Sequence, residues 1–328
     1  MTTRYAGVLA ALALVCAFLA VTQDVFLTWD NLMNIVKANT VVLVLATGAT
    51  FVVISAGIDL SAASAATAAG MVLGLTLQAR WGVVAALAAT ILTGIGLGLL
   101  NGVMIAQLKI SFLVVTLGTL SIYQSFALVV HDGQTVTVFG QPGFGALSDF
   151  VNDDVGPFPI LLIFDVALVL LAGGVLRYTS FGRALYAVGS NPEAARLNGI
   201  DVARILLVTY AIAGFAAGLA SVVQVGRLTG ASPQADPTLL LTVIAAVLIG
   251  GTAFAGGEGG VVGTVVGVLF LGVLQNGLTL SDVSSFWQGT VTGTILIAAV
   301  GLGVLRQRVA PSASGTVASV YRRWRGKR

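Results

Sequence analysis

The sequence predicts an all-α polytopic membrane protein with about ten transmembrane helices. Hydrophobic residues make up 57 % of the 328 residues and charged residues only 9 %, whereas soluble domains carry about 25 % charged residues. Apolar windows of about 20 residues, long enough to cross a bilayer as helices, recur along the chain. We therefore expect a single transmembrane domain over residues 1–305, followed by a basic tail at 306–328.

The first apolar window, Tyr5 to Val21, follows Arg4 and could be mistaken for a signal peptide. It lacks a clean small-x-small cleavage site and further spans follow it, so we interpret it as an uncleaved span. The windows at 39–56 and 239–254 are short and end in glycine-rich turns, which allows broken helices there. The remaining predicted spans are 61–78, 82–107, 111–130, 158–176, 204–225, 260–280 and 287–305.

The distribution of lysine and arginine predicts the orientation, because these residues are enriched in cytoplasmic loops. With the N-terminus in the cytoplasm, only Lys37, Arg80 and Arg227 lie outside. The inside set is Arg4, Lys109, Arg177, Arg183, Arg196, Arg204 and the tail residues Arg306, Arg308, Arg322, Arg323, Arg325, Lys327 and Arg328. An even number of spans returns the C-terminus to the cytoplasm, where the tail would be a membrane-surface anchor or a solvated end.

The residue content excludes several classes of site. Cys16 is the only cysteine and His131 the only histidine, so a disulfide framework and a Cys/His metal site are excluded. The chain has no GxxxxGK[ST] motif, so it cannot cradle ATP with a P-loop of its own. His131 is not tied to any serine or cysteine motif. We therefore expect a non-catalytic chain that binds no metal and no cofactor.

The connection at 131–157 falls outside the membrane in this topology. It contains four aspartates and no lysine or arginine, and its glycines and prolines favour an irregular, partly re-entrant cover over a separate domain. It is either a solvated connector or a docking surface.

The polar, basic segment 177–204 carries a complete signature for a short helix. Asn191 can cap the helix, Pro192 suits its first position, and Glu193 suits its positive N-terminal end. Gly199 can close the helix in the left-handed conformation. Such a doubly capped helix between two spans is either an ordinary loop helix or a rigid element that transmits movement to the spans.

Glycine-rich runs such as GIGLGLLNG (94–102) and GGVVGTVVGVLFLG (259–272) place small residues on helix faces. Small residues permit helix backbones to approach closely, so we expect most of these glycines to serve helix packing.

Two acids in or between spans are candidates for function, because ionisable groups are costly inside a membrane. Asp59 lies in SAGIDLSAAS at a glycine-bearing break, where it can also cap the following helix. Asp165 lies mid-span in LLIFDVALVL and needs either a polar partner or a water-filled path. Four further polar residues within spans could bind a polyhydroxylated solute or pair between helices: Asn101, Gln124, Gln275 and Asn276.

Four motifs together resemble the membrane permease subunits of ribose/xylose-type ABC sugar importers. They are GIDLS (57–61), GRALYAVGSNPEAARLNGI (182–200), AAVLIGGTAFAGGEGGVVGTVVGVLFLGVLQNGL (245–278) and VSSFWQ (283–288). The resemblance covers about residues 25 to 305. Two departures concern Glu258, where the family commonly has a basic residue, and TLLLTV (238–243), where an acidic run is frequent.

The resemblance implies a ten-span ABC importer permease in the bacterial cytoplasmic membrane, with both termini in the cytoplasm. It pairs with a second permease copy or a sister permease, with two ATPase subunits that carry ATP and Mg²⁺, and with an extracytoplasmic sugar-binding protein. It also implies that the segment 177–204 couples the permease to the ATPases. The residues that match the family's coupling motif are Gly182, Arg183, Gly189, Asn191, Glu193, Ala195, Arg196 and Gly199.

The predicted function is therefore translocation of a monosaccharide, driven by ATP hydrolysis in partner subunits. One alternative is an ABC permease for branched-chain amino acids or urea, against which GIDLS and NPEAARLNGI argue. The other is an ion-coupled secondary transporter, for which only Asp59 and Asp165 could form the coupling site.

Overall fold

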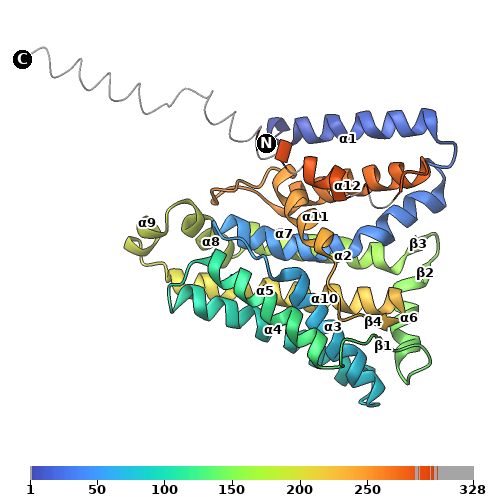
Figure 1. The fold of residues 1–328 in the computed structure, drawn as a ribbon. Helices are drawn as coiled ribbons and strands as arrows, with labels where there is room; N and C mark the ends of the chain where they lie inside the picture. Colours follow the sequence, from blue (N-terminus) through green and yellow to red (C-terminus); the bar gives the residue numbers. More distant parts are fainter. Residues whose placement is uncertain (1, 285–286, 288, 296, 299–300, 302–328) are drawn as a thin grey trace, which may run out of the picture.

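The computed structural model of the chain describes residues 2–284, 287, 289–295, 297–298 and 301. Long helices run side by side, with two short helices at one end of the bundle and short strands with a short helix at the other (Figure 1). Six of the described helices are long and apolar enough to cross a membrane: α2 (Trp29–Ile54), α4 (Val83–Ala106), α5 (Phe112–Val129), α7 (Ile160–Tyr178), α10 (Val202–Leu228) and α12 (Val261–Leu280).

Three more predicted spans are helices whose apolar parts are shorter than 18 residues: α1 (Thr2–Thr22), α3 (Ala62–Gln78) and α11 (Pro237–Ile249). The all-α, multi-pass prediction is confirmed, and the count of ten remains approximate. Part of the tenth predicted span, 287–305, including residues 302–305, and the whole tail at 306–328 lie outside the described residues.

Helix α2 corrects the prediction of a short or broken helix at 39–56. It begins at Trp29, because the extended Thr28 accepts a hydrogen bond from the Asn31 backbone N–H at 3.4 Å. Its first turns were left out of the predicted span because they are polar. These polar groups find partners within the protein: Lys37 pairs with Asp154 at 2.8 Å. The helix then runs unbroken to Ile54.

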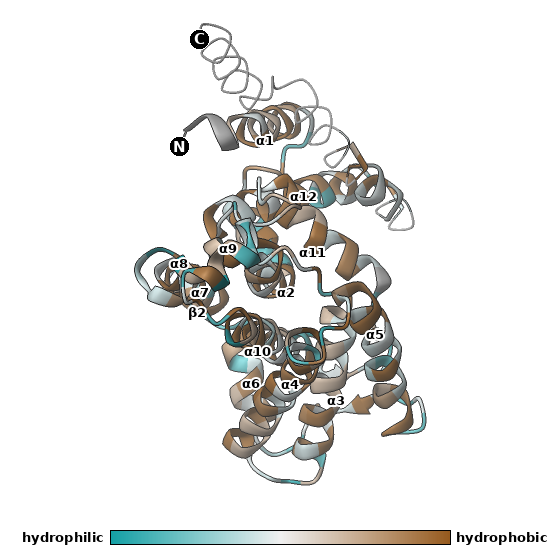
Figure 2. Cartoon of the chain, turned by 90° about the vertical axis from the view of Figure 1, so that its left-hand side faces the viewer, coloured by the Kyte–Doolittle hydropathy of each residue, from teal (hydrophilic) through white to brown (hydrophobic). Residues whose placement is uncertain are grey.

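Helix α2 is the central element of the bundle. It packs against α3, α7, α10, α11 and α12, and 78 % of its most apolar window is buried within the chain, against 22 % for α4 and for α7. The view along the bundle shows α2 in the middle, with α1 and α12 on one side and α3, α4 and α5 on the other (Figure 2). Helices on the periphery leave apolar side chains exposed, as expected for surfaces in contact with lipid.

Helices α4 and α10 pack closely against each other through glycine. A Cβ atom added at Gly98 would come within 2.9 Å of the Gly214 Cα and would collide with the Tyr210 carbonyl oxygen. A Cβ added at Gly94 would lie 2.8 Å from the Gly218 backbone nitrogen. The two helices therefore touch backbone to backbone, which confirms the packing role expected for the run at 94–102.

One end of the bundle carries a cover built from distant segments. Strand β1 (Val136–Thr137) pairs antiparallel with β4 (Gly230–Ala231), and β2 (Asp154–Val155) pairs antiparallel with β3 (Phe158–Pro159). Between them, α6 (Phe144–Asn152) packs on α10 and α7. The connection 131–157 is thus more regular than the irregular loop we predicted, because α6 has an apolar face (Phe144, Leu147 and Val151) that is buried.

The glycine contact predicts that two positions on α4 differ in how well they tolerate alanine. Gly98→Ala should lower the thermal stability of the purified protein, because overpacking of a filled interior costs about 1–3 kcal/mol. Gly96→Ala is the matched control, since a Cβ at Gly96 meets nothing within 4 Å and alanine favours helix by about 0.5–1 kcal/mol. Equal melting temperatures for the two variants in detergent would contradict the close contact.

Candidate functional site

The predicted coupling segment 177–204 contains a helix that the sequence analysis missed. Helix α8 (Ser180–Ser190) begins after Thr179, whose Oγ1 accepts a hydrogen bond from the Gly182 backbone N–H at 3.0 Å. The helix is amphipathic, with Gly182, Leu185, Val188 and Gly189 buried. The Thr179 cap and this spacing of small and apolar residues were the available signal.

Helix α8 is seated on the end of α2 and on the glycine-rich loop 250–260. Gly189 lies against the Ile54 carbonyl oxygen so closely that a Cβ there would collide with it. The same oxygen accepts a hydrogen bond from the Gly257 backbone N–H at 2.8 Å. From the other side, the Tyr186 hydroxyl donates to the Gly259 carbonyl at 2.8 Å. Three segments far apart in the sequence therefore meet at the last turn of α2.

Helix α9 (Pro192–Leu197) has the caps that the sequence predicts. The Asn191 side-chain oxygen accepts hydrogen bonds from the backbone N–H groups of Glu193 and Ala194, both at 3.0 Å. Gly199 adopts a φ of +82°. The Gly199 N–H donates to the Arg196 carbonyl and the Ile200 N–H to the Ala195 carbonyl, the two bonds of a Schellman motif. Both ends of this short helix are thus fixed by local hydrogen bonds.

Not every residue of the coupling motif is available on the surface of α9. The resemblance places Ala195 in that motif, but its side chain is only 3 % exposed and faces the protein interior. Leu197, which the sequence analysis did not select, is 81 % exposed. Arg196 and Glu193 form an exposed pair with a 3.9 Å separation between Nη2 and Oε1. The external surface of α9 therefore centres on an apolar side chain flanked by charges.

A buried polar network lies at the break between α2 and α3. Asp59 Oδ1 accepts hydrogen bonds from the Ser61 backbone N–H at 2.9 Å and from the Ser61 hydroxyl at 2.6 Å. The Ser61 Oγ in turn accepts a bond from Asn101 Nδ2 at 2.8 Å. Ser61, not Asp59, occupies the N-cap position of α3, and its side chain makes no capping bond. Asp59 thus bonds a backbone N–H just ahead of α3, as the capping interpretation allowed, but it does so from a position two residues before the N-cap.

The network extends to α5 through Tyr123, whose hydroxyl donates to the Leu97 carbonyl at 2.8 Å and lies 3.2 Å from Asn101 Oδ1. Tyr210 of α10 is 1 % exposed, and its hydroxyl has no hydrogen-bond partner among the described residues. A Cβ added at Gly57 would lie 3.0 Å from this hydroxyl. Residues from the break, α4, α5 and α10 thus gather polar groups in one place, which sequence spacing could not predict.

Asp165 and Gln124 lie elsewhere and bind protein groups. Asp165 Oδ2 accepts a hydrogen bond from the Thr40 hydroxyl of α2 at 2.9 Å, while Oδ1 is buried with no partner among the described residues. This geometry favours the polar partner over the water-filled path for Asp165. The Gln124 amide donates to the Pro233 carbonyl at 2.8 Å and accepts from the Ala235 N–H at 3.2 Å. Gln124 therefore holds the connection that leads into α11.

Asn276 and Asn31 exchange two amide hydrogen bonds, at 2.8 and 3.1 Å, and so tie α12 to the start of α2. This arrangement corresponds to pairing between helices rather than to a solute-binding group. Gln275 is half-buried on the same helix. Of the six candidates for the substrate path, Asp59 and Asn101 thus share one network, whereas Gln124, Asp165 and Asn276 each make a separate contact.

Ser61 offers a test of the network. Ser61→Ala should lower thermal stability, because it removes the hydroxyl that bonds both Asp59 and Asn101 and leaves the buried Asn101 Nδ2 without this acceptor. An unsatisfied buried polar group costs about 1–3 kcal/mol. Ser64→Ala is the matched control, since the buried Ser64 hydroxyl bonds only the Ser61 carbonyl one turn back. If melting curves in detergent show no larger loss for Ser61→Ala than for Ser64→Ala, the network is not a stabilising unit.

Comparison with known proteins agrees with this architecture. Residues 31–300 match the family model described as branched-chain amino acid transport system / permease component. The ribose import permease protein RbsC of Escherichia coli (strain K12) is 34 % identical over 89 % of this chain and 91 % of its own length. No solved structure matches the chain.

Two further relatives have similar coverage. The D-allose transport system permease protein AlsC of Escherichia coli (strain K12) is 34 % identical over 90 % of each chain. The xylose transport system permease protein XylH of Haemophilus influenzae is 33 % identical over 89 % of this chain and 94 % of its own. From the family match over residues 31–300 and these identities, we conclude that the chain belongs to the family of ABC importer permease components described by the branched-chain amino acid transport system permease model.

Proposed function

We propose that the chain is the translocation subunit of an ATP-driven importer of a monosaccharide. The observation that carries the proposal is the identity of 33–34 % over about nine-tenths of the chain to permeases whose names specify ribose, allose and xylose. The alternative of branched-chain amino acids or urea rests on the name of the family model alone. The sugar relatives favour the first function.

The positions of the cations support the proposed orientation. Lys37 and Arg227 lie at the end with the strands, where Arg227 Nη1 donates to the Lys37 carbonyl at 2.8 Å. Arg80 follows α3, which packs on β1 and β4 at this same end. Arg177, Arg183, Arg196 and Arg204 lie at the opposite end, on or beside α8 and α9. The excess of arginine there favours a cytoplasmic location for α8 and α9.

In this proposal, α8 and α9 receive the movement of partner ATPase subunits, which bind the ATP and Mg²⁺. Leu197 supplies an exposed apolar side chain, whose removal from water by a covering partner would be favourable. Movement of α8 would act on the Ile54 end of α2, because Gly189 is in backbone contact there. The break that carries Asp59 follows at once, so a push on α8 would reach the buried polar network through one contact.

The opposite face would receive the extracytoplasmic sugar-binding protein. The cover at this end exposes four aspartates: Asp132, Asp149, Asp153 and Asp154. Asp154 is engaged by Lys37, which also donates to the Asn152 carbonyl at 3.3 Å. We place a second permease copy or a sister permease beside this chain in the membrane, and the whole assembly in the bacterial cytoplasmic membrane.

An uptake measurement tests the function directly. Vesicles that contain the permease, its ATPase and its binding protein should accumulate radiolabelled ribose, allose or xylose only when ATP is present inside. The uptake should persist when ionophores collapse ion gradients, because the ATPase supplies the energy. Uptake that ionophores abolish and ATP does not support would identify an ion-coupled transporter instead.

The exposed leucine gives a second test. Leu197→Asp should reduce copurification of the ATPase subunit about tenfold or more, because burial of a leucine side chain contributes about 1.5–3 kcal/mol and about 1.4 kcal/mol corresponds to a tenfold change in affinity. Val155→Asp is the matched control, since Val155 is also exposed (58 %) but lies on β2 at the opposite end. Equal copurification for the two variants would show that α9 is only a linker.

A further inference from the structure

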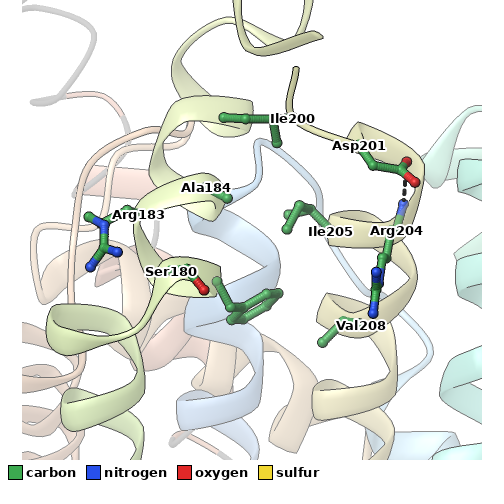
Figure 3. A pocket seen from close by; sticks show the side chains of 9 residues that line it. Ser180, Arg183, Ala184, Ile200, Asp201, Arg204, Ile205 and Val208 are labelled. Carbon is green, nitrogen blue, oxygen red and sulfur yellow. Dashed lines mark hydrogen bonds between the residues drawn. The ribbon is translucent and has the colours of Figure 1, made fainter. Parts of the chain in front are cut away.

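A cleft of about 720 Å³ opens between α8 and the first turns of α10, and it is not explained by the proposed contact with the ATPase. Phe181 of α8 and Ile205 and Val208 of α10 contribute apolar walls. Figure 3 shows Ala184 and Ile205 directed into the space between the two helices. Within the described part of the chain, this apolar lining is left without a covering segment.

The rim of the cleft is cationic. Arg204 extends along the α10 wall, and Arg183 lies at the edge of α8 and is directed away from the centre (Figure 3). Arg183 Nη1 donates to the Tyr178 carbonyl at 3.4 Å, and among the described residues neither guanidinium forms a salt bridge. Asp201 is the one acid in the lining, and its Oδ1 already accepts the Arg204 backbone N–H at 3.0 Å. The rim therefore favours an anion.

The cleft lies at the depth of the lipid headgroups in the membrane. Helix α7 ends at Tyr178, which is 74 % exposed and has the Arg177 guanidinium 5.5 Å from its ring centre. Exposed tyrosines mark the membrane interface. The step from Arg204 to Val208 spans about 6 Å at 1.5 Å per residue. The headgroup layer of one leaflet is about 5–8 Å thick, so a headgroup at Arg204 places an attached acyl chain beside Val208.

We propose that this cleft binds one anionic phospholipid, with its phosphate at Arg204 and an acyl chain along Phe181, Ile205 and Val208. A soluble anion would use the rim but would leave the apolar walls exposed to water. A neutral lipid would use the walls but gain nothing from the arginines. Basic clusters between helices on the cytoplasmic side recognise acidic headgroups. Of these three ligands, only an anionic lipid would contact both the arginine rim and the apolar walls.

Native mass spectrometry of the purified full-length permease, without ATPase, tests the proposal with phosphatidylglycerol and phosphatidylcholine of equal chain length. The wild type should prefer phosphatidylglycerol. Arg204→Gln should weaken binding of phosphatidylglycerol about fivefold and leave phosphatidylcholine unchanged, because one basic residue near a membrane contributes about 1 kcal/mol. Arg183→Gln should have a smaller effect, since its guanidinium points away from the cleft.

Arg80→Gln removes the same charge at the opposite end of the bundle and should not alter lipid preference. Ala184→Phe should fill the cleft and weaken binding of both lipids, with the melting temperature used to verify that the variant is folded. Unchanged preference in Arg204→Gln, or an equal loss in Arg80→Gln, would overturn the proposal. Complete displacement of phosphatidylglycerol by an equal concentration of soluble glycerol 3-phosphate would also overturn it, because the cleft would then be a site for a free anion.

Discussion

The structure depends on one constraint: inside a bilayer, every backbone N–H and C=O group must be bonded within the protein. Long helices meet this requirement by themselves, but the non-helical segment between α2 and α3 does not. Its groups are bonded locally and by neighbours, as in the bond from the Gly57 N–H to the Val52 carbonyl at 3.0 Å. The Thr116 hydroxyl of α5 reaches the Ile58 carbonyl at 3.4 Å. The break persists because other helices surround it.

Glycine makes this enclosure possible. Between α4 and α10, the glycines allow the two backbones to touch. No side chains separate these two helices, which lie beside the break. At the end of α2, Gly189 and Gly257 approach the same Ile54 carbonyl from two different segments. Any larger side chain at Gly189 would separate α8 from α2. The same absence of a side chain therefore serves packing in the bundle and contact between the proposed coupling helix and the spans.

The polar residues within the spans have two physical roles. One set of side chains is joined by a chain of hydrogen bonds from Asp59 through Ser61 and Asn101 to Tyr123. Such connected networks are expected to stabilise more than separate pairs. Asn276 and Asp165 each join two helices at a single point. In the proposed transporter, the connected network is the better candidate for a part that changes between conformations, because it links the break to three different helices.

The sequence alone determined the class of the protein, since hydrophobic windows, arginine placement and capping residues act over a few neighbouring positions. It predicted the multi-pass helical fold and the local geometry of α9, where Asn191 and Gly199 each bond a group no more than three residues away. These features were predictable because each depends on residues adjacent in the chain. The family assignment followed from motifs of the same local kind.

Only the tertiary structure decided which side chains meet and which faces are exposed. Ala195 and Leu197 are both compatible with an outward face, and packing on α8 and α10 buried the first and exposed the second. The polar start of α2 was excluded from the predicted span because its partners, Asn276 and Asp154, lie more than 100 residues away. Asp59 likewise turned to Ser61 in a network completed by α4 and α5. Such choices depend on contacts between distant segments, and no local pattern encodes them.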